Sequence, residues 1–409
     1  MSIFWIKIWG QRVRDFYRSV FHSTKSLYAS TFANSVLNFI SGIVMAHVLG
    51  PASRGIVQEF KILTSVIPSA LHLNLGSYIS SQGIKKDFNF KGILLHLAIT
   101  WLIFGFYVYA AFDNKITTLN IFLIIAAYPL YFSSTFLVGL AVKQARNNIL
   151  ALMSFITVGG SSIGITVLYF FDTLKTNTAI YTFLFFSLVS FALVIRHVNM
   201  PIGSRSIYVD FLKFMPIHFS VFVGVLIGYL DQIYLMLLVG SKVLGIYVVA
   251  LSFASISNFI TSPILLVVPQ IASTNQKAVT QKRGLQLISF VYLTLFAVFV
   301  ALIAPLVIKF QDRFLDDSYD EISKMLLPIC AGVLLSSYND MLRAYLAFLN
   351  IGRILIYERI VHIFSITVFF IFIFYAENYL LIAFYLLVTQ FLSFIYLKFN
   401  LGPHLKNTI

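Results

Sequence analysis

The ionisable residues inside long apolar runs are the part of this sequence best suited to do chemistry. Asp231 is the clearest case, with Gln232 beside it and Tyr234 one turn further on. A charged side chain at the centre of a membrane-spanning helix costs about 2.5–3.5 kcal/mol on insertion scales, so its presence needs a reason. A carboxylate in this setting can take up a proton or bind a sodium ion, which makes Asp231 a candidate ion-coupling residue. The alternative is a structural pair with a neighbouring cation.

A second polar group lies further along the chain. Ser336, Asp340 and Arg343 follow an i, i+4, i+7 pattern, which places them on one face of a helix. We interpret Asp340 as a second ion-coupling residue and Arg343 as a contact for an anionic substrate. Asp340 and Arg343 are also close enough to pair within the helix, and that neutral ion pair is the alternative.

Four further polar residues are candidate substrate contacts. Lys61 offers a cation to an anionic ligand, and His72 can titrate or meet a phosphate. Asn34 and Asn38 lie one turn apart in the first apolar run, where amides facing lipid are costly. Arg54, in the sharp turn that follows this run, is a further candidate for contact with an anion, but an anchor at the membrane interface is the favoured interpretation.

Several functional classes are excluded by what the sequence lacks. It has no G-x-x-x-x-G-K-[ST] loop for ATP, a single cysteine (Cys330) and no cluster with metal-ligand spacing. We therefore expect no metal site and no cofactor beyond a coupling H⁺ or Na⁺. The formal charge of +14 comes from basic residues scattered over short loops, so we expect no nucleic acid partner.

Membrane-spanning helices must position these residues. The chain is 59% hydrophobic and 11% charged, with a mean hydropathy of +0.89. Apolar runs of about 20 residues, the length that crosses a bilayer core, recur along it. We expect spans at residues 27–49, 56–82, 92–112, 121–142, 149–171, 178–197, 214–240, 245–271, 287–309, 324–349, 357–376 and 380–399.

The basic residues give these twelve spans an orientation. With the N-terminus in the cytoplasm, 20 basic residues lie inside and seven outside, so the positive-inside rule predicts that both termini are cytoplasmic. Residues 1–26 form a basic segment with an apolar helical face, which is typical of a helix lying on the inner membrane surface. An ordinary basic flank to the first span is the alternative.

An internal repeat relates the two halves of the chain. A shift of 190 residues lays Gly50 over Gly240 and Gly55 over Gly245. Gly50 and Pro51 are expected to end the first span in a tight hairpin, and the later glycines to permit close packing. We expect a first bundle at 27–197, a cytoplasmic linker at 198–213, a second bundle at 214–399 and a cytoplasmic tail at 400–409.

The same shift superposes two stripes of small or polar residues. Ser30, Asn34, Asn38 and Ser41 map onto Ser220, Gly224, Gly228 and Asp231. Polar residues in a membrane usually face a bundle interior or a wet cavity. We therefore expect an all-α polytopic protein with twelve transmembrane helices in two parallel six-helix repeats around a central cavity, bordered by both stripes. Close helix packing is the alternative reading of the small residues.

With these features assembled, the sequence resembles a known family. Leu49-Gly50-Pro51 followed by Arg54-Gly55, with the degenerate copy at Gly240 and Gly245, resembles the polysaccharide-transporter family of lipid-linked oligosaccharide flippases, O-antigen flippases among them. The motif is shared in looser form with multidrug exporters and lipid II flippases of the same superfamily. Lipid II flippases typically carry two further spans, which this chain lacks.

The resemblance implies transport without bond chemistry. The expected activity is ion-coupled translocation of an undecaprenyl-pyrophosphate-linked glycan across a bacterial inner membrane by alternating access. The implied partners are this glycan, membrane lipid, and the polysaccharide polymerase and chain-length regulator. A multidrug exporter is the main alternative. A polysaccharide polymerase is disfavoured because the longest outer loop is only about residues 310–322.

Overall fold

The computed structural model describes most of the chain. The described ranges are 2–71, 90–112, 118–143, 147–197, 222–257, 317–348, 352–376 and 378–406, with a few single residues between 294 and 315. For residues 2–28 only the backbone is described. Within these ranges the chain is helical with no strand, which confirms the predicted all-α class.

The helices of the first half form a first bundle. They are α1 (Ser2–Lys61), the π-helix η1 (Ile62–Val66), α2 (Ile67–Leu71), α4 (Phe90–Phe112), α5 (Thr118–Lys143), α6 (Asn147–Ser154), the π-helix η2 (Phe155–Gly160), α7 (Ser161–Phe170) and α8 (Thr176–His197). α1 packs against α6, α7 and α8, and α4 packs against α5. Helix α1 is continuous through residue 26, so the basic segment and the first span are one helix.

The helices of the second half form a second bundle. They are α11 (Leu230–Tyr234), the π-helix η3 (Leu235–Val239), α12 (Ser241–Ala254), the 3₁₀ helices η4 (Ser255–Ser257) and η6 (Asp317–Tyr319), α16 (Ile322–Phe348), α17 (Gly352–Ala376), the 3₁₀ helix η7 (Tyr379–Phe384) and α18 (Tyr385–Lys406). Residues 222–227, just before α11, are also helical. α16 packs on α12, α17 and α18.

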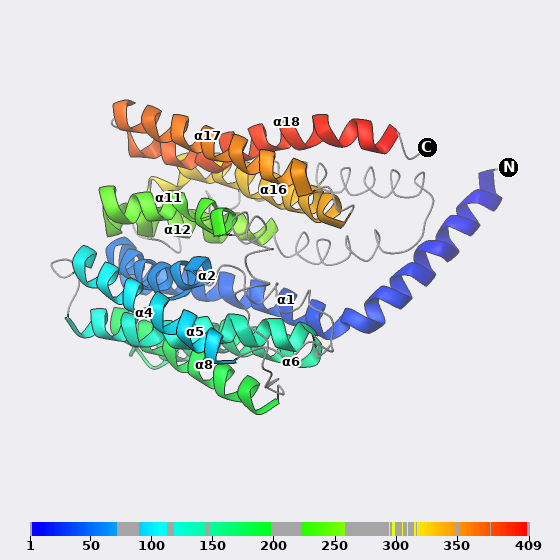
Figure 1. Ribbon diagram of the computed structural model, residues 1–409. Coiled ribbons are helices and arrows are strands. Elements are labelled where there is room, and N and C mark those ends of the chain that lie inside the picture. Colours follow the sequence, from blue (N-terminus) through cyan, green and yellow to red (C-terminus); the bar gives the residue numbers. More distant parts are fainter. Residues whose placement is uncertain are drawn as a thin grey trace.

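The two bundles lie as two tiers joined through α1 and α12. In Figure 1, α16, α17 and α18 form one tier and α4, α5, α6 and α8 the other, with α1 and α12 in contact between them. Helix α1 begins and α18 ends at the same end of the molecule. We call the region around Gly50 and Gly240, where α1 turns into its second arm and η3 is followed by α12, the hairpin end.

Both predicted glycine breaks have a backbone that only glycine adopts easily. Gly50 has φ +69° and splits α1 into two arms, and Gly240 has φ +117° and separates η3 from α12. A side chain is strained at such angles, whereas glycine tolerates them. The second arm of α1 starts directly at Pro51 and α12 starts at Ser241. These helices therefore begin five and four residues earlier than the sequence predicts, because a single glycine makes each turn.

The lengths and surfaces of the helices are those of a multi-span membrane protein. The described residues contain six apolar segments long enough to cross a bilayer, and the first, Ala29–Ser69, has 41 residues. A helix of that length spans about 60 Å, twice a bilayer core of about 30 Å, so its two arms are two spans. Large apolar side chains such as Phe106 and Tyr375 are about four-fifths exposed, as expected for surfaces that face lipid. The predicted ninth span, 287–309, lies almost wholly outside the described residues.

Candidate functional site

The two bundles touch most closely at the hairpin end, through backbone rather than side chains. A side chain at Gly55 would collide with the Ser241 carbonyl, and one at Gly245 would collide with the Pro51 carbonyl. The second arm of α1 and the first turns of α12 therefore cross at two glycines that the repeat superposes. We call this contact, formed by Pro51, Gly55, Ser241 and Gly245, the seam.

Side-chain hydrogen bonds also join the two bundles beside the seam, and the Glu59 carboxylate is the charged acceptor among them. The Gln58 amide donates to Gln232 Oε1 over 2.7 Å, and the Ser241 hydroxyl donates to Glu59 Oε1 over 2.6 Å. The Tyr319 hydroxyl, from the second bundle, donates to the Ala46 carbonyl over 3.2 Å. Sequence reasoning missed these bonds because they join residues far apart in the chain.

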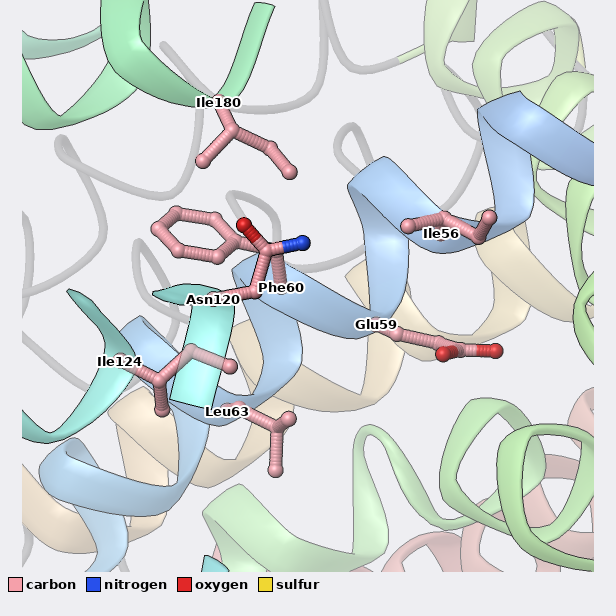
Figure 2. A pocket seen from close by; sticks show the side chains of 7 residues that line it. All are labelled: Ile56, Glu59, Phe60, Leu63, Asn120, Ile124 and Ile180. Carbon is pink, nitrogen blue, oxygen red and sulfur yellow. The ribbon is translucent and has the colours of Figure 1, made fainter. Parts of the chain in front are cut away.

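Glu59 belongs to the seam although it also borders a pocket of the first bundle. That small, mostly apolar pocket is lined by Ile56, Glu59, Phe60, Leu63, Asn120, Ile124 and Ile180. Figure 2 shows the Glu59 carboxylate pointing away from the Asn120 amide. Its partner Ser241 lies in the other bundle, so the carboxylate serves the contact between bundles rather than the pocket.

Arg54 is buried in the seam, which corrects its interpretation as an interfacial anchor. Only 3% of the residue is exposed, because the adjacent Gly55 brings the second bundle against it. Tyr319 is close enough to interact electrostatically with Arg54. In the part of the chain that the structure describes, Nε and Nη1 of Arg54 are buried without a hydrogen-bond partner.

The contact between bundles continues along the first arm of α1 away from the hairpin end. Phe39 packs edge-on against Phe253 with ring centroids 5.8 Å apart, and a methyl group at Gly42 would lie 3.1 Å from the Ser252 hydroxyl. One turn beyond Gly42, Asn38 is exposed. Its predicted place on the wall of a cavity between the bundles stays a prediction.

Asn34 lies elsewhere, inside the first bundle. Its amide donates to the Ser154 hydroxyl of α6 over 2.8 Å, and Ser41 donates to Ser162 of α7 over 3.2 Å. Asn34 is 6% exposed. The polar stripe of the first span thus faces the helices of its own bundle at these two positions.

Asp231 is correspondingly buried inside the second bundle, with 1% of the residue exposed. Its Oδ2 accepts a short hydrogen bond from the Tyr247 hydroxyl of α12, and its Oδ1 accepts one from the backbone N–H of Gln232 over 2.8 Å. Nearby, the Tyr385 hydroxyl donates to the Ile227 carbonyl over 3.0 Å. No lysine, arginine or histidine of the described residues forms an ion pair with Asp231.

Asn34 and Asp231 each make their hydrogen bonds within their own bundle. Asn34 bonds to Ser154 of α6 and Asp231 to Tyr247 of α12, and the shared cavity between the bundles stays a prediction. A stripe of small or polar residues indicates that something packs against it, and the partner is a helix of the same repeat. The stripes correspond in part. Gly224 lies against Arg359 of α17 as the first stripe lies against α6 and α7, whereas Asp231 bonds to Tyr247 of α12.

Arg343 belongs to a buried charged cluster in the second bundle. The cluster comprises Asp340, Arg343, Glu358, Arg359 and His362 from α16 and α17. Arg343 pairs with Asp340 over 2.6 Å and with Glu358 over 2.7 Å, and donates to Ser393 of α18 over 3.0 Å. The structural ion pair considered in the sequence is therefore formed, and Arg343 is engaged by its own bundle.

Glu358 is the centre of this cluster and was missed in the sequence. Its side chain is fully buried, lies 3.6 Å from the Arg359 Nε and 3.7 Å from the His362 ring, and accepts a short hydrogen bond from Ser393. Two acids balance two arginines, so the cluster is neutral when His362 is neutral. Once Arg343 is known to be buried, the need for an acid beyond the half-exposed Asp340 follows, but that burial is not visible in the sequence.

Lys61 and His72 are the remaining predicted contacts, and Lys61 is close enough to Arg54 to interact with it electrostatically. The Lys61 ammonium lies 3.9 Å above the centre of the Phe183 ring of α8, inside the first bundle, in a cation–π contact. His72 lies outside the described residues. Among the residues described, no group of three His, Cys, Asp or Glu side chains is placed to hold a metal ion, and Cys330 is buried.

Comparisons with known proteins show the fold. No protein-family model matches the sequence, and neither does a curated protein. The structure resembles that of the lipid II flippase MurJ in an inward closed conformation, with a TM-score of 0.65 at 14% identity over 92% of this chain and 87% of that one.

Two MATE transporters are also similar. An inward-facing multidrug resistance MATE family transporter of the MOP superfamily has a TM-score of 0.61 at 16% identity over 92% of this chain and 96% of that one. The Vibrio cholerae MATE transporter VcmN has a TM-score of 0.60 at 12% identity over 95% and 98%. The chain therefore has the fold of MOP-superfamily transporters, which confirms the predicted resemblance at the level of the fold.

Proposed function

We propose that this protein is an alternating-access transporter that moves an undecaprenyl-pyrophosphate-linked oligosaccharide across a bacterial inner membrane. The seam is the observation that carries this proposal. It joins two bundles of a transporter fold at one end of the molecule, and the topology predicted from the basic residues makes the hairpin end the outer end. The conformation is then one that is closed to the outside.

The contacts at the seam are weak enough for the two bundles to separate there. Among the described residues the seam's side-chain hydrogen bonds are few. The neutral ones contribute about 0.5–1.5 kcal/mol net each, and the one to the Glu59 carboxylate about 1.5–3 kcal/mol. At the two glycine crossings the helices meet backbone to backbone, so their separation there breaks no interlocked side chains. The bundles can thus rock apart at the outer end while each keeps its own internal contacts.

The substrate class rests on the resemblance in the sequence and on the fold shared with a lipid flippase. Leu49-Gly50-Pro51 and Arg54-Gly55 are the motif that favours a lipid-linked glycan, and the flippase match supports a substrate with a lipid tail. We infer that the protein works alongside a polymerase and a chain-length regulator. The second candidate is a multidrug exporter, favoured by the similarity to MATE transporters.

Ion coupling is proposed at Asp231. A fully buried carboxylate without a cationic partner is stable only when it is protonated or when it holds a cation. Tyr247 and the Ile227–Tyr385 pair surround it with polar oxygens. We infer that uptake and release of H⁺ or Na⁺ at this acid drives the transport cycle.

Transport in reconstituted vesicles tests the proposed function. The purified protein is placed in liposomes with an imposed H⁺ or Na⁺ gradient, and transfer of a fluorescent undecaprenyl-pyrophosphate glycan is compared with transport of a fluorescent cationic drug. Gradient-stimulated transfer of the lipid-linked glycan supports the proposal. Drug transport without glycan transfer selects the multidrug exporter, and absence of both rejects the two candidates.

A further inference from the structure

Arg54 is a buried cation beside the seam, and no described residue forms an ion pair with it. Only 3% of Arg54 is exposed. Its Nε and Nη1 atoms are buried without acceptors. Burying a guanidinium in this way is strongly unfavourable, since charged groups removed from water need a partner.

The second bundle offers a contrast that shows what a compensated arginine looks like. Arg343, also largely buried, has an acid on each side at 2.6 and 2.7 Å and a hydroxyl at 3.0 Å. Arg54 has the uncharged Tyr319 as its neighbour across the seam. A residue that serves only packing gains nothing from a free charge, so the charge of Arg54 must be used in another conformation.

That conformation is the one in which the seam is open. Gly55, next to Arg54, is in backbone contact with Ser241, so separation of α1 from α12 at the hairpin end uncovers the guanidinium. Its unused donors then face the space between the bundles. A planar guanidinium with several free N–H groups matches the paired oxygens of a phosphate or pyrophosphate.

We propose that Arg54 is an anion-binding residue, hidden in the closed seam and exposed when the bundles part, that binds a phosphate group leaving on the outer side. This rests on the proposed function for the direction of transport and for the lipid-linked pyrophosphate as the substrate. The phosphate belongs either to this substrate or to a phospholipid headgroup of the outer leaflet. Release of the phosphate and re-burial of Arg54 would complete the cycle.

The test compares Arg54→Gln and Arg54→Lys with Lys242→Gln, which removes an exposed cation at the same end of the molecule. Melting temperatures are measured with and without inorganic pyrophosphate, and transfer of a fluorescent lipid-linked glycan and of fluorescent phosphatidylglycerol is measured in liposomes. Without pyrophosphate, Arg54→Gln should have a higher melting temperature than the wild type, because the buried unpaired charge is gone. It should also lose the pyrophosphate-induced rise in melting temperature and slow glycan transfer at least tenfold.

The controls separate binding from structure. Arg54→Lys should recover part of the transfer, and Lys242→Gln should match the wild type in every measurement. Slower transfer of the glycan alone assigns the phosphate to the substrate, whereas a loss confined to phosphatidylglycerol assigns it to the bilayer. A purely structural arginine predicts the reverse pattern, in which Arg54→Gln melts lower than the wild type.

The inference can fail separately from the proposed function. A wild type that transfers no glycan rejects the function, but the pyrophosphate-dependent melting of wild type and Arg54→Gln still decides whether Arg54 binds an anion. A lowered melting temperature in Arg54→Gln, or an unchanged response to pyrophosphate, overturns the inference even if the glycan is transported.

Discussion

The two bundles hold equivalent helices with different chemistry. In the first bundle, neutral amides and hydroxyls fix α1 to α6 and α7, as in the Asn34–Ser154 and Ser41–Ser162 hydrogen bonds. The second bundle places charges at the corresponding faces, with Asp231 beside α12 and Arg359 against Gly224. Neutral contacts can be lost cheaply, whereas buried charges constrain both stability and protonation. This difference supports our proposal that ion coupling belongs to the second bundle, whereas the contacts of Asn34 and Ser41 serve as a scaffold within the first.

The largest effect on stability is expected from Glu358→Gln. This change leaves Arg343 and Arg359 with only the half-exposed Asp340, and breaking a buried ion pair typically costs about 3–5 kcal/mol. Thermal unfolding of the purified protein should show a large loss. The double variant Glu358→Gln with Arg359→Gln should be more stable than Glu358→Gln alone, because the charges balance again. Equal stability of wild type and Glu358→Gln would remove the cluster as a structural element.

An intermediate loss of stability is expected from substitutions at Gly55 and Gly245, the two seam glycines that the repeat superposes. Gly55→Ala and Gly245→Ala should each lower the free energy of unfolding by about 1–3 kcal/mol, because the added methyl group meets backbone of the other bundle. Gly105→Ala in α4 is the control, since its methyl group would meet Ile125 at 3.6 Å, an ordinary contact. Thermal unfolding without denaturant compares the three variants. A large difference between Gly55→Ala and Gly245→Ala would break the symmetry of the seam.

A small effect is expected in the first bundle. Asn34→Ala removes one neutral hydrogen bond to Ser154 and should cost about 1 kcal/mol. Ser154→Ala should have a similar effect, and the double variant should lose less than the sum of the single variants, since both remove the same bond. Thermal unfolding is again the measurement. A loss of gradient-driven transport in Asn34→Ala would contradict the scaffold role of this contact.

Asp231→Asn should change stability least, yet it should abolish the response of transport to an ion gradient. Asparagine keeps the size of the side chain and can still bond to Tyr247, but it cannot ionise. We expect folded protein whose transport no longer responds to an H⁺ or Na⁺ gradient in vesicles. Asp340→Asn is the matched control and should keep the response, because Asp340 is half-exposed and paired with Arg343. A normal gradient response in Asp231→Asn would exclude the coupling role.

Local features of this fold could be predicted from the sequence, and contacts between distant segments could not. Apolar length indicated the spans, and the glycines at 50 and 240 indicated breaks, because both depend on the residues at those positions. The direction of each polar stripe depends on which helix packs against it, so Asn34 and Asp231 were expected to face a shared cavity. Glu358, in the next helix, was likewise not recognised as a partner of Arg343.

The burial of Arg54 illustrates the same limit. In the sequence, an arginine in a turn between two spans is typical of a residue at the membrane interface. Its burial results from Gly55, which lets the second bundle approach, and from Tyr319, which is 265 positions further along the chain. Identifying the seam therefore required the packing of both bundles, although the glycines that permit it were visible as a repeat.

Reversible cross-linking of the seam tests the central claim most directly, which is that the bundles separate at the hairpin end during transport. Gln58→Cys and Gln232→Cys, whose native side chains meet at 2.7 Å, are combined with Cys330→Ala and joined by a reducible thiol cross-linker. The control joins Asn34→Cys to Ser154→Cys, a 2.8 Å pair within one bundle. Cross-linking Gln58→Cys to Gln232→Cys should abolish transport, reduction should restore it, and the control should transport in both states. Undiminished transport with the seam cross-linked would contradict the account.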